Sequence, residues 1–165
     1  MTIARDRPLT LHLPDADATA ALASRIAPML RAGDVLLLEG PIGAGKTHFA
    51  RSLIQARLAA ENQAEDVPSP TYTLVQTYDA GGVEIWHADL YRLSDASEAD
   101  ELGLAQAFAD AIVLVEWPDR LGPLSPAGAL HLSLTPEGTG DGRLARLTGG
   151  PRWAALLDKL ADAHV

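Results

Sequence analysis

The chain has 165 residues, 47% hydrophobic and 21% charged, which is typical of a globular protein with one buried core. Its formal net charge of −9 argues against binding nucleic acid phosphates alone, because that affinity comes mainly from Lys and Arg. The absence of cysteine excludes disulfide partners and a thiol nucleophile. Since no apolar stretch is long enough for a membrane span and no secretory signal is visible, we expect a cytoplasmic protein.

The first elements of the chain follow strand and helix patterns in turn. Residues 9–13 alternate between apolar and polar and predict a short strand. A helix is expected next, with Asp15 or Asp17 as its N-cap and Gly33 at its end. Pro28 lies inside this helical pattern and indicates a kink.

The middle of the chain predicts a hairpin and a further helix. Residues 67–92 consist of a proline-rich entry and two strand patterns on either side of an Ala-Gly-Gly turn, which favours an antiparallel hairpin. Residues 97–110 have a helical pattern, with Ser94 or Ser97 as the candidate N-cap.

The last third predicts a strand, a hairpin and a closing helix. Residues 111–118 contain a second continuous apolar run, a hairpin is expected around 138–142, and Pro151 begins the final helix. With no linker or repeat, we expect one domain over residues 1–165. The alternation of strands and helices predicts an α/β, three-layer sandwich with a mixed, mostly parallel sheet of the P-loop NTPase type.

A glycine-rich loop joins two of the clearest elements. The apolar run 34–39 predicts a strand buried on both faces, and residues 46–60 predict a helix. Between them, Gly40–Thr47 fits the pattern G-x-x-x-x-G-K-[ST] at every fixed position. Gly43 and Gly45, on either side of the small Ala44, allow the backbone to curl so that successive N–H groups cradle phosphate oxygens.

Two side chains at the end of this loop complete the phosphate site. Lys46 can reach the terminal phosphates, and the Thr47 hydroxyl can ligate Mg²⁺. The alternative is an ordinary strand–helix turn, but the buried strand before the loop and the helix after it favour a nucleoside triphosphate site. No Asn-Lys-x-Asp signature for guanine is present in the sequence, which favours ATP.

Two carboxylates stand where such a site needs an acid. Glu116 ends the apolar run 112–115, the position at which an acid holds Mg²⁺ or its water. Asp89 also follows a predicted strand. Because ligands of open α/β sheets bind beyond the carboxyl ends of parallel strands, we expect both acids to converge on the loop. The alternative for each is a solvated carboxylate.

Several neighbouring residues are open to two interpretations. His87 is either a proton carrier or a packed core residue, and the packed interpretation is favoured. Trp117 either covers the nucleotide or belongs to the core. Ser69 and Thr71 flank a proline, and their hydroxyls either sense the nucleotide or bond their own turn. Arg92 is not a convincing arginine finger, so slow turnover by the isolated protein is predicted.

Together these residues resemble the TsaE family, also called YjeE, of small bacterial ATPases that act in tRNA threonylcarbamoyladenosine synthesis. The resemblance runs from about residue 33 to 121 and depends on the order and spacing of four segments. These are LEGPIGAGKTHFARSL (38–53), SPTYTLVQTY (69–78), HADLYR (87–92) and VLVEWPDRL (113–121).

The resemblance implies an ATPase that works with TsaB and TsaD on the adenosine beside the anticodon of certain tRNAs. The tRNA would be reached through the complex, in agreement with the acidic composition. The implied phosphate loop runs from Gly43 to His48, with Lys46 catalytic and Thr47 and Glu116 at the metal. Asp89 and Glu116 are implied to be catalytic, and Trp117 and Thr71 to contact the nucleotide.

Two positions depart from the family's common G-D-L-G-A-G-K-T pattern. Pro41 replaces an aspartate, and His48 stands where a second threonine is common. Neither is a fixed position of the loop, and the backbone N–H of His48 can still bind phosphate. Residues 122–165 carry no strong family motif and are expected to complete the sheet and add a packing helix.

Two other functions fit parts of the pattern. A small P-loop kinase would need an acceptor pocket and usually an arginine-rich lid, and no such segment is evident. A nucleotide-responsive assembly subunit with little turnover would not need both Asp89 and Glu116.

Overall fold

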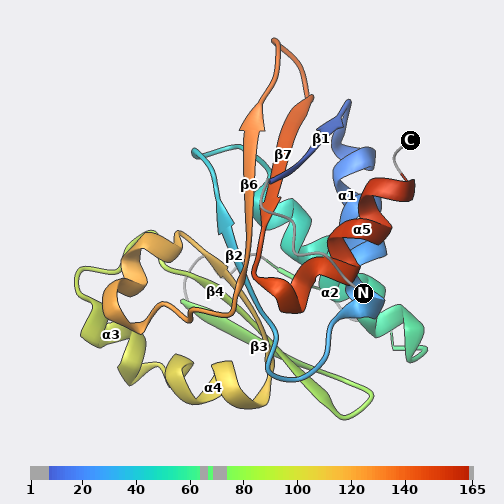
Figure 1. Ribbon diagram of the computed structural model, residues 1–165. Helices are drawn as coiled ribbons and strands as arrows, with labels where there is room; N and C mark the ends of the chain where they lie inside the picture. Colours follow the sequence, from blue (N-terminus) through green and yellow to red (C-terminus); the bar gives the residue numbers. More distant parts are fainter. Residues whose placement is uncertain (1–7, 64–66, 69–73, 164–165) are drawn as a thin grey trace.

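The fold is built around one mixed sheet. Figure 1 shows the computed structural model, which describes residues 8–63, 67–68 and 74–163. The strands of this part are β1 (Leu9–Leu13), β2 (Val35–Glu39), β3 (Val75–Ala80), β4 (Val83–Asp89), β5 (Ile112–Glu116), β6 (Leu130–Pro136) and β7 (Arg143–Thr148). Within the described chain they form a 7-stranded sheet in the order β1-β7-β6-β2-β5-β4-β3.

The strand directions match the predicted mixed sheet. The central pairs β6–β2, β2–β5 and β5–β4 are parallel, whereas β1–β7, β7–β6 and β4–β3 are antiparallel. Consequently β1, β6, β2, β5 and β4 all run the same way, and β7 and β3 run against them. The expectation of a mostly parallel sheet is confirmed in this sense, although both edge strands, β1 and β3, pair antiparallel with their neighbours.

Helices cover both faces of the sheet. The α-helices of the described residues are α1 (Ala16–Ile26), α2 (Lys46–Ala60), α3 (Ala96–Glu101), α4 (Leu104–Asp110) and α5 (Ala154–Ala163). Helices α1, α2 and α5 lie on one side of the sheet, and α3 and α4 lie on the other (Figure 1). This confirms the three-layer α/β sandwich. Among the described helices, none has the length and apolar character needed to cross a membrane.

The two-sided burial of the central strands explains their continuous apolar runs. Side chains of β2 alternate between the two layers: Leu36 packs in the cluster that contains Phe49 of α2, and Leu37 packs in the cluster that contains Leu104 of α4. Each buried side chain of this size contributes roughly 1.5–3 kcal/mol to stability. Both faces of β2 are therefore apolar, as a strand between two helical layers requires.

The entry to α1 is set by one of the two predicted caps. The Asp15 carboxylate accepts the Ala18 N–H at 2.8 Å, which satisfies an otherwise unpaired donor of the first turn. The α-helix ends at Ile26, and a 3₁₀ turn, η1 (Ala27–Met29), follows it. This is earlier than the end predicted at Gly33, because Pro28 has no N–H to continue the α-helical ladder.

The stretch predicted as one helix over 97–110 forms two helices instead. Gly103 has φ +84° and separates α3 from α4, since a left-handed residue cannot continue a right-handed helix. The predicted caps Ser94 and Ser97 are also wrong: Asp95 is the N-cap, and its carboxylate accepts the Ser97 N–H at 3.1 Å.

The remaining predicted elements are present with small differences. The turn between β3 and β4 is Gly81–Gly82, both with positive φ, as a two-residue hairpin favours. Strands β6 and β7 form the second hairpin. Pro151 opens a 3₁₀ turn, η3 (Pro151–Trp153), that leads into α5. Because β2, β4 and β5 are parallel neighbours, their carboxyl ends meet at one edge of the sheet.

Candidate active site

The loop between β2 and α2 has a backbone that glycine adopts far more readily than other residues. Gly43 has φ +81° and Gly45 has φ +102°. A Cβ at either position would meet no atom within 4 Å, so the backbone conformation, and not lack of space, requires glycine here. Left-handed residues alternating with others turn successive N–H groups toward one anion. Helix α2 begins at Lys46 and adds its positive dipole end.

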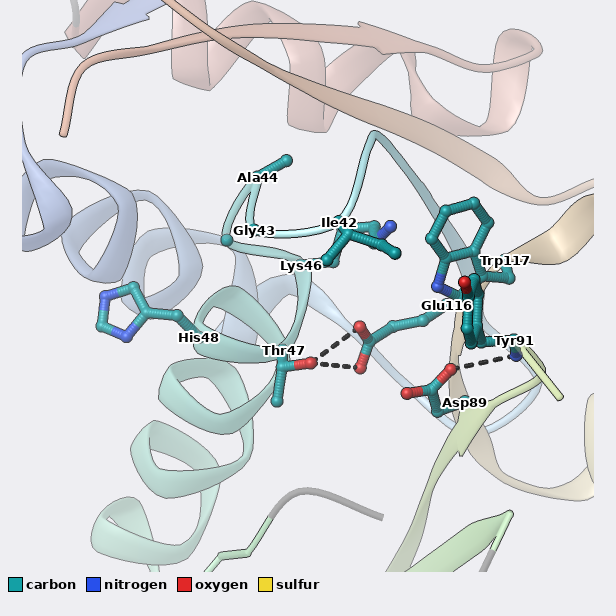
Figure 2. Close-up of a pocket in the computed structure, with 11 residues that line it drawn as sticks. Ile42, Gly43, Ala44, Lys46, Thr47, His48, Asp89, Tyr91, Glu116 and Trp117 are labelled. Carbon is teal, nitrogen blue, oxygen red and sulfur yellow. Dashed lines mark hydrogen bonds between the residues drawn. The ribbon is translucent and has the colours of Figure 1, made fainter. Parts of the chain in front are cut away.

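A cavity of about 400 Å³ opens against this loop (Figure 2). It is lined by Ile42, Gly43, Ala44, Gly45, Lys46, Thr47, His48, Asp89, Tyr91, Glu116 and Trp117. Every site residue predicted from the sequence is in this lining except Thr71. Thr71, like Ser69, lies outside the described residues. The fold thus brings together residues from three separate segments of the chain.

Glu116 is the most constrained acid of the cavity. Its side chain is buried and points at the start of α2 (Figure 2). The Thr47 hydroxyl lies 2.8 Å from Oε1 and 2.9 Å from Oε2, and the His87 ring nitrogen Nε2 lies 2.7 Å from Oε2. A buried carboxylate is costly unless donors satisfy it, and these two groups supply them.

His87 is packed, as expected, but it also belongs to the site. Its ring is fully buried on β4 with Nε2 directed at Glu116. Because a carboxylate accepts hydrogen bonds, Nε2 is the donor, and the ring acts as a support that orients Glu116. The sequence could have indicated this role, because His87 and Asp89 are two residues apart and therefore lie on the same face of a strand.

Asp89 stands next to Glu116 at the carboxyl end of the sheet. The two residues are paired in the register of β4 and β5. Asp89 Oδ1 accepts the Tyr91 N–H at 3.1 Å, which Figure 2 shows as a dashed line. Burial raises the pKa of Asp89, and the nearby Glu116 raises it further, while the bond from Tyr91 opposes both. Asp89 is therefore protonated more easily than an ordinary aspartate, and it lines the cavity.

Lys46 is held by the loop itself in this structure. Its ammonium group donates to the carbonyl oxygen of Gly40 and lies 3.6 Å from the centroid of the Trp117 ring. Only 5% of Lys46 is exposed, and burial lowers its pKa, although the charges of Glu116 and Asp89 oppose that shift. A phosphate would have to draw the ammonium group away from these contacts.

The open side of the cavity is apolar. Trp117 follows β5 with a left-handed backbone, φ +59°, which is unusual for a non-glycine residue and turns its ring over Lys46. The Tyr91 ring lies 5.0 Å from the Trp117 ring, and Ile42 of the loop is 73% exposed. Sequence reasoning missed Tyr91 and Ile42, because an exposed apolar side chain has no signature in a single sequence.

His48 lines the cavity, but its ring is bound to α1. Its ring nitrogen Nε2 lies 2.9 Å from the carbonyl oxygen of Ala16, at the start of α1, and points away from the acids in Figure 2. The side chain therefore anchors α2 to α1. Arg92 is exposed and does not line the cavity.

The sheet order, the glycine loop before α2 and the acid at the end of the neighbouring strand define a P-loop nucleotide-binding protein. The model of the family described as "Threonylcarbamoyl adenosine biosynthesis protein TsaE" matches residues 13–144. The chain belongs to this family, which is assigned to threonylcarbamoyladenosine biosynthesis in tRNA. The match is wider than the segment 33–121 that carries the motifs, since it reaches β1 at one end and β7 at the other.

Individual relatives agree with this assignment. The protein named tRNA threonylcarbamoyladenosine biosynthesis protein TsaE from Rickettsia felis is 39% identical over 75% of this chain and 71% of its own length. The Bacillus subtilis protein of the same name is 32% identical over 87% of each chain. The crystal structure of YdiB from Bacillus subtilis superposes with a TM-score of 0.76 and 26% identity, covering 96% of both chains.

Proposed function

We propose that this chain hydrolyses ATP, in concert with TsaB and TsaD, to support the threonylcarbamoyl modification of the adenosine beside the anticodon of tRNA. One observation carries the hydrolytic part of this proposal. Asp89 and Glu116 are paired across β4 and β5 and line the same cavity as the phosphate loop. Binding alone would not require two acids at this position.

The loop and its surroundings suit the phosphates of ATP. The N–H groups from Gly43 to His48, together with the dipole of α2, would hold the β- and γ-phosphates. Lys46 would exchange its contacts with Gly40 and Trp117 for a phosphate oxygen. Trp117 and Tyr91 would then border the nucleotide. The missing guanine signature favours ATP over GTP.

The donors at the start of α2 fit Mg²⁺. The Thr47 hydroxyl donates its hydrogen to Glu116, which leaves oxygen lone pairs that can bind a cation. The described residues contain no cluster of three or more His, Cys, Asp or Glu for a metal. This agrees with Mg²⁺, which is usually held by one or two protein groups together with phosphates and water. When bound, the ion would neutralise charge on the phosphate oxygens.

The two acids have different surroundings, which suggests different roles. Glu116 accepts hydrogen bonds from Thr47 and His87 and would help to hold the metal ion. One oxygen of Asp89 accepts the Tyr91 N–H, and the residue lines the cavity. We therefore propose that Asp89 positions the attacking water. The water oxygen bonds to the γ-phosphorus as the bond to the bridging oxygen breaks, which yields ADP and inorganic phosphate.

The family and the charge of the chain support the proposed partnership. The net charge of −9 makes direct tRNA binding unfavourable, so tRNA would be reached through TsaB and TsaD. No arginine among the described residues lines the cavity, and slow hydrolysis by the isolated protein is expected. We further propose that residues 1–165 act as one ATPase domain in the cytoplasm, where tRNA is modified.

The deciding experiment measures ATP hydrolysis by the purified protein, alone and with TsaB and TsaD, beside Lys46→Ala and Glu116→Ala. Slow turnover that rises with the partners and is lost in both variants is expected. Turnover indifferent to the partners but stimulated by a small metabolite would point to a kinase. Full complementation by Asp89→Asn, with ATP binding intact and hydrolysis absent, would point to an assembly subunit.

A further inference from the structure

Arg143, at the start of β7, reaches back about a hundred residues to the phosphate loop. Its Nε donates to the carbonyl oxygen of Ala44 at 2.8 Å, and its Nη2 donates to that of Gly43 at 3.1 Å. Its Nη1 donates to the carbonyl oxygens of Gly142 at 2.8 Å and Gly140 at 3.3 Å. One half-buried guanidinium therefore ties the loop to the β6–β7 hairpin.

One of the two loop carbonyls belongs to the turn that shapes the loop, and the other belongs to a peptide group expected to face phosphate. The Gly43 carbonyl shares its peptide plane with the Ala44 N–H, which donates to the Pro41 carbonyl oxygen at 3.1 Å. The Ala44 carbonyl shares its plane with the Gly45 N–H, one of the donors expected to face a phosphate. By holding the two carbonyls, Arg143 sets the orientation of these two peptide planes before any nucleotide is present.

The loop needs such support because of its composition. Gly43 and Gly45 lose more backbone freedom on ordering than any other residue type, and both take left-handed conformations here. A loop that is ordered only when the nucleotide arrives spends part of the binding energy on its own ordering. A guanidinium on two of its carbonyls orders the loop in advance, and its charge also polarises the Ala44–Gly45 peptide group so that the Gly45 N–H is a stronger donor to an anion.

We propose that Arg143 is a positioning residue for the nucleotide phosphates and acts through the backbone of the phosphate loop. This rests on the proposed function, since it assumes that the loop binds ATP. Arginine suits the role because its planar fork offers several donors in a fixed geometry, whereas a lysine ammonium group is a point charge. The bonds go to carbonyl oxygens, so the residue is distinct from an arginine that contacts the phosphate itself.

The test measures the affinity of the whole protein for Mg²⁺-ATP by calorimetry in Arg143→Ala, Arg143→Lys and the control Arg146→Ala. Arg146 lies on the same strand but is exposed and does not line the cavity. Arg143→Ala is expected to bind about tenfold more weakly or worse, because charge-assisted hydrogen bonds are lost at two carbonyls. The ATP affinity of Arg143→Lys should lie between that of Arg143→Ala and that of the unaltered protein. The affinity of Arg146→Ala should match that of the unaltered protein.

Chemical rescue separates positioning from folding. Low concentrations of guanidinium should restore ATP affinity to Arg143→Ala, whereas an equal concentration of sodium should not. A merely destabilised protein would be weakened further by guanidinium. If Arg143→Ala does not fold, Arg143→Lys decides: affinity equal to that of the unaltered protein would overturn the inference.

The outcomes for this inference and for the proposed function are distinct. If the unaltered protein does not bind ATP, the proposed function fails. If the unaltered protein binds ATP and Arg143→Ala binds it equally well, the function stands and the role of Arg143 is refuted.

Discussion

The Thr47 hydroxyl and the Glu116 carboxylate are in hydrogen-bond contact although 69 positions separate them in the chain. The distances from Thr47 Oγ1 are 2.8 Å to Oε1 and 2.9 Å to Oε2, so one hydrogen is shared between both oxygens. Thr47 lies in the first turn of α2 and Glu116 ends β5, so the contact connects the end of the phosphate loop to the edge of the sheet that carries the acids. It also leaves the threonine oxygen able to bind a cation.

The first prediction concerns this hydroxyl. Thr47→Ser keeps the hydroxyl and should retain most ATP hydrolysis. Thr47→Val keeps the shape of the side chain without the hydroxyl, and its rate of ATP hydrolysis should fall about tenfold or more. The measurement is a Mg²⁺ titration of hydrolysis in the complex with the partners, with chelator as the zero point. If both variants depend on Mg²⁺ concentration in the same way, the Thr47 hydroxyl is not a ligand of the metal.

The second prediction concerns the loop lysine. Lys46→Ala should weaken ATP binding by roughly 10- to 100-fold, because a charge-assisted contact to phosphate is lost. Lys159→Ala is the matched control, since Lys159 is the other lysine of the chain and is exposed on α5. Calorimetric titration with ATP measures both. Loss of affinity in the control as well would indicate an unspecific charge effect.

The third prediction concerns the pH dependence of stability. Because the folded-state pKa of Asp89 is raised, mainly by burial, its charged form is less favourable in the folded than in the unfolded protein. Asp89→Asn should therefore raise the unfolding temperature at neutral pH while it abolishes hydrolysis. The gain should shrink as the pH falls through the raised pKa and Asp89 takes up a proton. Thermal unfolding of both proteins across that range is the measurement, and a gain that grows toward low pH would contradict it.

The fourth prediction concerns the buried support of Glu116. His87→Leu leaves the carboxylate with one donor fewer and should lower the free energy of unfolding by about 1–3 kcal/mol. His12→Leu serves as the control, because the His12 side chain is 73% exposed. Urea unfolding without nucleotide compares the two. Equal stability in the two variants would mean that the bond from His87 to Glu116 contributes nothing.

The fifth prediction concerns the corrected helix cap. Asp95→Ala should cost about 1 kcal/mol, since it removes the acceptor for the Ser97 N–H at the start of α3. Ser94→Ala and Ser97→Ala should each have little effect. Denaturant unfolding of the three variants measures this, and a larger loss at either serine would restore the cap predicted from sequence.

The helix boundaries show where the local sequence pattern agrees with the final structure and where it differs. Residues 46–60 were predicted as a helix and form one with the same bounds, because an N-terminal glycine loop and a continuous helical pattern agree. Residues 97–110 have the same kind of pattern, yet Gly103 takes a left-handed conformation and divides it. A glycine inside a helical pattern is compatible with both outcomes, and only packing selects one of them.

The sequence by itself determined the parts of this protein whose physics is local. A glycine pattern between a buried strand and a helix specifies a phosphate loop, and an acid after an apolar run marks a strand end. The tertiary structure decided which groups meet: Glu116 with His87 and Thr47, Lys46 with Trp117, and Arg143 with the loop. These contacts join segments that are tens of residues apart, and strand order and register, which no local pattern encodes, set the distances between them.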